Sequence, residues 1–413
     1  MVYLNQTQRV LHPTPVKWDT GVYLEFHLPD AYDNNARKVG SGTFGSVIWT
    51  KATTNPVNEH RKRIVIEVAV KKINRAINHP REAQICYREL KLLQHLDHSN
   101  IARIVDLYTP SRNARELHTI YLVMEYAGST IEKLLNQSAT ENYAYLPMSK
   151  IPRIMRDILR ALKYLKAADV LHRDLKPDNV AIDASGKAVL IDFGLSRTGR
   201  ETNKSAELTD GAGTPAYAAP EVSFWRGGSY GREADIWSLG CILAALLSWE
   251  HLFKNQKRKV SIYTTLIGQI PAHFMEKVYD PLLKTFMETE SASAPCPADM
   301  TPLKEYFSNR NKVAERNDPR IEPALSFLKG CLQYDTATRF PSGYNVNCIN
   351  LMTRLTIEQA LEHVFLDGIG ITEDEYSVQP LVYDDSDRDI DDWKCVLFSE
   401  ITNFEARPDT PRP

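Results

Sequence analysis

The chain of 413 residues is 43% hydrophobic and 25% charged, a composition typical of a folded protein with room for more than one core-forming unit. Its formal net charge of −2 excludes a general electrostatic attraction to nucleic acid or to an anionic membrane. The six cysteines form no Cys-x-x-Cys pair, and no signal-peptide core or membrane-spanning window occurs. We therefore expect a reduced, intracellular protein without a zinc site.

Residues 1–30 show no clear periodicity, and we expect them to form an arm or additional strands. From Arg37 to Ile73 many residues are β-branched and alternate with polar ones, which predicts strands joined by a long exposed loop over Thr53–Lys62. The run Val68-Ala69-Val70 places Lys71 on an apolar strand, where its ammonium needs an anion. The next residue, Lys72, points to the opposite face of the strand and is expected to be solvated.

Three glycines, Gly40, Gly42 and Gly45, precede Val47 in this region. Glycine lets backbone amides approach phosphate oxygens without obstruction by a side chain, so the pattern indicates a phosphate-binding loop. Alone the pattern is weak, and a glycine-rich hairpin without a ligand remains an alternative. A dinucleotide site is disfavoured because strand-like residues, rather than a helix, follow Gly45.

Residues 81–97 carry Ile85, Leu92, Leu93 and Leu96 at helical spacing, and Glu89 lies on the same face. A carboxylate on an apolar face needs a cationic partner, because an unpaired buried charge is unfavourable. A buried strand is then predicted at Tyr121-Leu122-Val123-Met124, ended by Ala127-Gly128.

Beyond Gly128 the apolar pattern becomes helical, first between Ile151 and Leu165 and later between Ile236 and Leu247. Asp235 precedes the second helix and is interpreted as a carboxylate that caps backbone amides at its start. The sequence thus predicts a strand-rich first part and a helical second part that meet near Gly128.

Four polar residues with related spacing lie between the two helices. Asp174, Lys176 and Asn179 fall in the segment His172–Asn179, and Asp192 opens an Asp-Phe-Gly tripeptide 13 residues after Asn179. Asp174 can receive the proton of a hydroxyl group, and Lys176 can stabilise charge on a transferring phosphoryl group. Asn179 and Asp192 offer the oxygen ligands that magnesium prefers. His172 is interpreted as a packed structural histidine, because Asp174 already fills the role of a base.

With these motifs assembled, residues 35–366 resemble the eukaryotic protein kinases. The resemblance implies an α+β, bilobal fold that binds ATP and Mg²⁺, with Lys71 and Glu89 fixing the α- and β-phosphates. It also implies that Gly40, Gly42, Gly45, Val47, Ala69, Lys71, Met124, Glu125 and Ala127 surround the nucleotide. Lys176 after Asp174 is the serine/threonine form. The segment from Gly213 to Glu221 resembles the end of the activation loop, in which Thr214 helps to seat a peptide and Glu221 pairs with an arginine, here Arg339 or Arg354.

Finer similarity points to the mitogen-activated protein kinases, and within them to the stress-activated branch. It rests on the run from Tyr87 to Leu93, the run from Asp106 to Pro110, and the tail from Asp389 to Phe404. In that family the tail packs back on the N-terminal lobe, and an acidic cluster before it binds basic linear motifs. The matching residues are Glu373, Asp374 and Glu375, with Asp384 and Asp385 as possible additions; a solvated acidic turn is the alternative.

Regulatory residues depart from the family pattern. Its members carry Thr-x-Tyr in the activation loop, whereas this chain has Thr209-Asp210-Gly211, and the arginines that neutralise the phosphotyrosine are replaced by Pro215 and Ala218. We hypothesise activation by phosphorylation of Thr209 alone, bound by Arg88 and Arg173, with Thr202 and Ser205 as lesser candidates. Because the family arginine at Ala218 shapes a pocket for proline after the acceptor, a preference for proline is in doubt.

The sequence therefore predicts a divergent mitogen-activated serine/threonine kinase. The expected parts are an arm at 1–30, an N-lobe at 31–127, a C-lobe at 128–366 with insertions near 253–327 and 341–352, and a C-terminal docking segment at 367–413. Expected partners are protein substrates, an upstream activating kinase and basic docking motifs, without nucleic acid or membrane. We expect a cytoplasmic monomer, with nuclear entry left open. The alternatives are a pseudokinase that serves as a docking scaffold and a small-molecule kinase of related fold.

Overall fold

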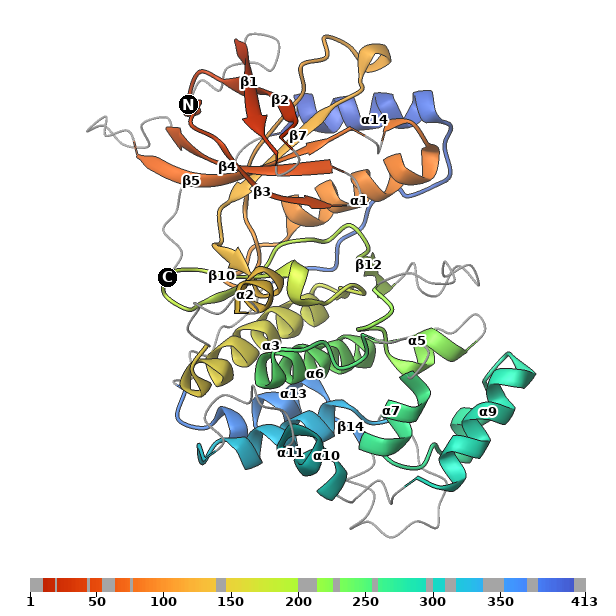
Figure 1. Cartoon of the computed structure of the whole chain (residues 1–413). Coiled ribbons are helices and arrows are strands. Elements are labelled where there is room, and N and C mark those ends of the chain that lie inside the picture. The colour runs from red at the N-terminus through yellow and green to blue at the C-terminus, as the bar shows by residue number, and fades with distance from the viewer. Residues whose placement is uncertain are drawn as a thin grey trace. The chain divides into compact units, whose positions relative to one another are not determined.

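The computed structural model describes residues 10–18, 21–42, 45–53, 64–74, 77–138, 146–199, 214–225, 231–254, 259–294, 300–308, 317–336, 353–369 and 378–404. The chain divides into two compact units. Unit 1 comprises Met1–Ala127 together with Val382–Pro413, and unit 2 comprises Gly128–Leu381. Unit 1 is rich in strands and unit 2 is mainly helical (Figure 1), which confirms the predicted α+β class. Within the described ranges, no helix combines the length and the apolar content needed to cross a membrane.

Unit 1 is built on a five-stranded antiparallel sheet in the order β3-β4-β5-β7-β6. Its strands are β3 (Arg37–Gly42), β4 (Gly45–Thr53), β5 (Val65–Ile73), β6 (Ile104–Tyr108) and β7 (Ile120–Glu125). The first residue of β4 has to be glycine, because a Cβ atom on Gly45 would lie 1.8 Å from the carbonyl oxygen of Lys72. Gly45 is therefore required for the close approach of β4 to β5, independently of the phosphate-binding role expected from the sequence.

The N-terminal residues form a hairpin of β1 (Leu11–Lys17) and β2 (Tyr23–Pro29). Its apolar side chains Val16, Phe26 and Leu28 share a core cluster with residues of the sheet. The expectation that Lys72 is solvated holds only in part, because the residue is half-buried: its Nζ donates to the carbonyl oxygen of Glu25, at 2.6 Å, and lies over the Phe26 ring. Burial accordingly lowers the pKa of Lys72.

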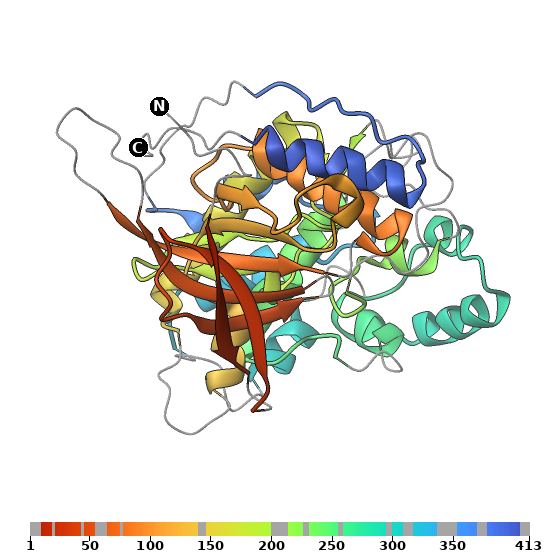
Figure 2. The ribbon, with the colours of Figure 1, turned by 90° about the horizontal axis from the view of Figure 1, so that it is seen from above.

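Helix α1 (Pro80–His95) packs beside the C-terminal helix α14 (Ile390–Thr402), which is blue in Figure 2. The ring of Tyr87 in α1 contacts two aromatic rings of the C-terminal segment, with centroids 5.3 Å from Trp393 and 6.0 Å from Tyr383. Trp393 is fully buried in this contact. The C-terminal segment is thus part of the core of unit 1, and it covers the outer side of α1.

Unit 2 is organised around α3 (Ile151–Ala167) and α6 (Glu233–Ser248). Helix α6 is apolar on all sides and almost completely buried. It packs closely on α11 (Ile321–Cys331), because a Cβ on Gly240 would lie only 2.7 Å from Cβ of Cys331. The other helices are α2 (Ile131–Ser138), α5 (Pro220–Phe224), α7 (Lys259–Leu266), α8 (Ala272–Met275), α9 (Pro281–Ala292), α10 (Thr301–Ser308) and α13 (Ile357–Leu361).

Short strand pairs position the loops of unit 2. They are β8 (Ser129–Thr130), β9 (Val170–Leu171), β10 (Val180–Ile182), β11 (Ala188–Leu190), β12 (Arg197–Thr198), β13 (Asp335–Thr336) and β14 (Thr353–Arg354). Strand β10 lies between β11 and β8, and β9 pairs with β12. The loop that carries Asp174 is therefore fixed by a strand at each end.

Candidate active site

In unit 1 the structure brings Lys71 and Glu89 together. Lys71 projects from β5 and donates through Nζ to Oε1 of Glu89 in α1, at 2.6 Å. Both side chains are more than nine-tenths buried, so each provides the countercharge that the other needs. The neighbouring Cys86 stays a neutral thiol, because burial and the Glu89 carboxylate raise its pKa to about 12.

The other predicted nucleotide residues of unit 1 lie on neighbouring strands. Val47 of β4 pairs with Gly40 of β3 on one side and with Lys71 of β5 on the other. In β5, Ala69 pairs with Met124 of β7. Gly42 and Gly45 lie at the facing ends of β3 and β4, Glu125 ends β7, and Ala127 follows it. Four adjoining strands therefore carry these residues: the glycines lie on β3 and β4, Lys71 lies on β5, and Glu125 ends β7.

In unit 2 a buried carboxylate holds the loop that contains Asp174. Oδ2 of Asp235 accepts from the backbone N–H of His172, and Oδ1 accepts from that of Arg173, both at 3.0 Å. These contacts hold Arg173 at φ 69°, a left-handed conformation that is rare outside glycine. The predicted capping of its own helix is wrong, because α6 begins at Glu233 and Asp235 instead binds amides about 60 residues earlier in the chain. Burial raises the pKa of Asp235, and the contacts with His172 and Arg173 oppose this rise.

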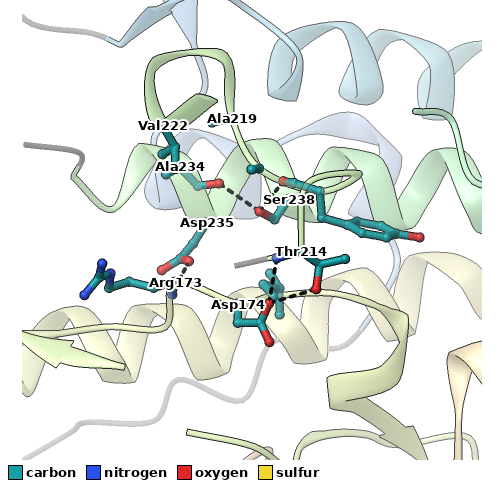
Figure 3. A pocket seen from close by; sticks show the side chains of 11 residues that line it. Arg173, Asp174, Thr214, Ala219, Val222, Ala234, Asp235 and Ser238 are labelled. Carbon is teal, nitrogen blue, oxygen red and sulfur yellow. Dashed lines mark hydrogen bonds between the residues drawn. The ribbon is translucent and has the colours of Figure 1, made fainter. Parts of the chain in front are cut away.

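Asp174 lies at the centre of a polar network, of which Figure 3 shows the contacts with Thr214. Its Oδ2 lies 2.7 Å from Nζ of Lys176 and accepts from Nδ2 of Asn179 at 3.0 Å. Its Oδ1 accepts from the backbone N–H and from the hydroxyl of Thr214, each at 3.1 Å. Lys176 also donates to the Thr214 hydroxyl, at 2.8 Å. The network fixes a carboxylate, an ammonium and a hydroxyl within contact of one another, which suits proton transfer and stabilisation of phosphoryl charge.

The remaining residues of the predicted constellation lie next to this network. The backbone N–H of Ile191 donates to the carbonyl oxygen of Asn179, which ties Asp192 to the end of the loop, and Oδ1 of Asp192 accepts from Gly194 N–H. His172 is buried, with its ring 5.3 Å from that of Phe193, as a packed structural histidine would be.

The donor set of this region fits magnesium. Asn179 and Asp192 offer side-chain oxygens, and both Nδ2 bonds of Asn179 go to Asp174, which leaves Oδ1 as its ligand atom. No group of three or more acidic, histidine or cysteine side chains that could enclose a metal occurs in the part of the chain that the structure describes. This is compatible with Mg²⁺, which usually takes one or two protein ligands and completes its shell with phosphate oxygens and water.

Glu221 pairs with Arg354, which decides between the two arginines that the sequence left open. The contact is bidentate, with Nη1 to Oε1 at 2.5 Å and Nη2 to Oε2 at 2.9 Å. Arg354 is fully buried and also donates to the carbonyl oxygens of Glu233 and Gln333. The segment that begins at Thr214 is thus anchored at its far end; Arg339 lies outside the described residues.

The regulatory residues are only partly described. Thr209, Glu373, Asp374 and Glu375 lie outside the described residues, as do Thr202 and Ser205. Arg88 is described, and its Nε donates to Oδ2 of Asp385 at 2.7 Å, with a second contact from Nη2 to the same oxygen. Asp384 binds Arg388. Of the two further acidic residues, Asp385 is largely buried against Arg88, whereas the side chain of Asp384 stays 68% exposed beside Arg388.

Sequence reasoning missed Lys259, which is buried at the start of α7. Its Nζ contacts the carbonyl oxygens of Pro215 and Ala218, the two positions that depart from the family pattern. In the sequence it ends a run of basic residues that reads as a solvated surface. A signal was present in the apolar residues Val260 and Tyr263 at helical spacing, which place Lys259 at the edge of a buried face.

Comparison with known proteins decides the family, because residues 34–366 match the protein kinase domain. The chain belongs to the protein kinase family. Among its relatives, the kinase is 30% identical over 395 residues to mitogen-activated protein kinase pmk-3 of Caenorhabditis elegans, covering 94% of this chain and 76% of that one. It is equally similar to mitogen-activated protein kinase 13 of Bos taurus, with 94% and 93% covered. Mitogen-activated protein kinase p38a of Drosophila melanogaster is 29% identical over 392 residues, with 93% of each chain covered.

These matches confirm the predicted serine/threonine kinase of the stress-activated mitogen-activated branch, with ATP and Mg²⁺ as cofactors. At this identity about seven residues in ten differ from the relative. Replacement of the two family arginines by Pro215 and Ala218 is compatible with this degree of divergence.

Proposed function

We propose that the kinase phosphorylates serine and threonine in protein substrates by means of the two residue sets described above. Asp174 accepts the proton of the substrate hydroxyl, and Lys176 stabilises charge on the transferred phosphoryl group. Asn179 and Asp192 hold Mg²⁺, and Lys71, fixed by Glu89, binds the α- and β-phosphates of ATP. The Asp174 network carries this proposal, because Asp174 is joined directly to Lys176, Asn179 and Thr214.

The first test compares the wild-type kinase with the variant Asp192→Asn, using magnesium ATP and a randomised peptide array. We expect phosphorylation of serine and threonine peptides by the wild type and a loss of at least about 100-fold in the variant, since a metal ligand is weakened. Binding of ATP without turnover in the wild type would contradict the proposal and favour a scaffold.

The same array reads the residue that follows the acceptor. We propose that selection for proline at this position is weak or absent, because alanine replaces the family arginine at Ala218 and proline replaces the other arginine at Pro215. Strong enrichment of proline at the position after the acceptor would contradict this proposal, since another residue would then form the pocket for proline.

We also propose that phosphorylation of Thr209 alone activates the kinase. Arg173 adjoins Asp174, so a phosphate bound by Arg173 would act directly on the loop that Asp235 holds. Arg88 is the second candidate ligand. Its guanidinium already binds Asp385, so a phosphate would compete with that carboxylate. Each of these arginines can supply charge-assisted hydrogen bonds to a phosphate.

After treatment with an activating kinase, Thr209→Ala is expected to lower activity at least about tenfold, since one charge-assisted hydrogen bond contributes roughly 1.5–3 kcal/mol. The measurement is the initial rate on a peptide from the array, together with phosphate content by mass spectrometry. Thr202→Ala and Ser205→Ala serve as controls and should retain activity. Full activity of Thr209→Ala would contradict activation at this site.

A further inference from the structure

Lys259 is a buried lysine whose three donors are all occupied. Its Nζ donates to the carbonyl oxygen of Pro215 at 2.7 Å, to the carbonyl oxygen of Ala218 at 3.2 Å and to Oγ of Ser223 at 3.0 Å. Only 4% of the residue is exposed, and the ammonium also lies near the ring of Tyr263, 5.6 Å from its centroid. An ammonium has three N–H bonds, so no donor of Lys259 is left for another group.

All three acceptors are neutral, so burial of this charge is unfavourable without an opposite charge in contact. An apolar residue of similar volume would avoid the desolvation, as substitutions of other buried charges show. The ammonium therefore has a role that an apolar side chain could not fill. It donates hydrogen bonds to the carbonyl groups of Pro215 and Ala218, which belong to one segment.

Four residues of the segment Thr214–Ala219 line a cavity that reaches Asp174 (Figure 3), namely Thr214, Tyr217, Ala218 and Ala219. Ala218, Ala219 and Val222 line the cavity beyond Thr214. Since consecutive Cα atoms are about 3.8 Å apart, a peptide whose hydroxyl lies at Asp174 places its next residue in reach of this cavity. Lys259 lies on the other side of the segment and is not part of the lining.

We propose that Lys259 is a positioning residue, which shapes this cavity through the carbonyls of Pro215 and Ala218 and thereby determines which residue beside the acceptor is accepted. The inference rests on the proposed function, in which Asp174 receives the proton of the acceptor hydroxyl. The remaining contacts support it, because the rest of the segment is held independently. Thr214 binds Asp174, and the carbonyl oxygen of Tyr217 accepts from Ser238. Pro215 and Ala218 are the positions whose carbonyls Lys259 holds.

The charge of Lys259 changes within an accessible pH range. Burial lowers its pKa to about 8, against the opposing influence of the Glu221 carboxylate. The neighbouring thiol and phenol groups stay neutral around this pH. Cys241 of α6 has a pKa raised to about 12 by burial, and the pKa of Tyr263 is raised far above its usual value. Glu221 of α5 is bound to Arg354 of β14. Above pH 8 the amine has two N–H donors instead of three, so the hold on the segment weakens as pH rises.

The test measures peptide selection and steady-state kinetics of the full chain with the variant Lys259→Met. We expect the KM for peptide to rise about 10- to 100-fold, as for a displaced positioning group, with the KM for ATP unchanged and selection at the following position reduced. In the wild type the KM for a peptide without titrating groups should rise above about pH 8, and this rise should be absent from Lys259→Met.

Lys329→Met is the matched control. Lys329 is also buried, and it donates to the carbonyl oxygens of Leu266 and Ile267 at the opposite end of α7. The variant Lys329→Met should lower thermal stability to a similar degree as Lys259→Met. It should leave peptide selection and the pH profile of the peptide KM as in the wild type. Equal kinetic effects of both variants would overturn the proposal, since the role of Lys259 would then be purely structural.

Two other results also decide the matter. A specific loss of acidic residues from the selected peptides in Lys259→Met would overturn positioning in favour of direct recognition. If Lys259→Met does not fold, a wild-type peptide KM that is constant between about pH 7 and 9 overturns the proposal. A wild type that phosphorylates no peptide contradicts the proposed function itself, whereas an active wild type with an unaltered Lys259→Met contradicts only this inference.

Discussion

Replacing Asp174 with asparagine is expected to lower kcat for peptide phosphorylation by about 10²- to 10⁴-fold, the range for loss of a positioned acid–base group. The asparagine amide cannot accept the hydroxyl proton. The hydrogen bonds of the side chain are also disturbed, because both oxygens of Asp174 act as acceptors, one for Lys176 and Asn179 and the other for Thr214. Whichever way the amide turns, its NH₂ group faces another donor. The rate should therefore fall even though the side chain keeps its size.

Steady-state kinetics and nucleotide binding together check this prediction. The KM for ATP should change little in Asp174→Asn, because the residues proposed to hold the phosphates and Mg²⁺ are intact. Asp178→Asn is the control, since Asp178 lies on the same turn and is exposed. It should keep a kcat close to that of the wild type. An Asp174→Asn variant with wild-type kcat would remove Asp174 from the proposed chemistry.

Replacing Arg354 with methionine is expected to lower the free energy of unfolding of unit 2 by about 3–5 kcal/mol, the usual cost of leaving one member of a buried ion pair without its partner. Glu221 is almost completely buried, so water cannot replace the lost guanidinium. The carbonyl oxygens of Glu233 and Gln333 lose a donor at the same time. Denaturation can be followed by tryptophan fluorescence, because the guanidinium lies 5.1 Å from the ring centroid of Trp237.

Two further variants distinguish a buried pair from ion pairs in general. Lys166→Met removes a pair with Glu358 in which both side chains are 46% exposed, and it should cost less than about 1 kcal/mol. The double variant Glu221→Gln/Arg354→Met should recover part of the stability lost by Arg354→Met, because no unpaired carboxylate remains. A loss for Arg354→Met as small as that for Lys166→Met would contradict the argument.

The contacts between Lys71 and Glu89 and between Asp174 and Lys176 could be expected from the sequence, because the relations behind them are local or periodic. Spacing within the loop indicated Asp174, Lys176 and Asn179, and helical periodicity turned Glu89 inward, where it meets Lys71. The strand-rich and helical parts were likewise predicted from the change of period near Gly128. Such patterns repeat every two or every 3.6 residues, so a short window is enough to detect them.

What the sequence could not supply are contacts between distant segments. Asp235 was assigned to its own helix, because nothing near it shows that its carboxylate binds amides of His172 and Arg173. Lys72 was expected in water, because the hairpin that covers it lies more than 40 residues earlier. Arg354 could not be separated from Arg339, since both follow a threonine and precede an apolar residue. In each case the contact partner is determined by the packing of distant segments, and such packing produces no periodic pattern in the sequence.

The two units of the kinase are assembled from the chain in different ways. Unit 2 is continuous, whereas unit 1 needs Val382–Pro413 to cover α1 and to place Trp393 against Tyr87. During synthesis domains generally fold as units while the chain emerges. Unit 2 can complete its core first, whereas α1 of unit 1, although made earlier, lacks its contact with Trp393 until Val382–Pro413 has been made. The helix that carries Glu89 is therefore covered only after Val382–Pro413 has been made, long after α1 itself.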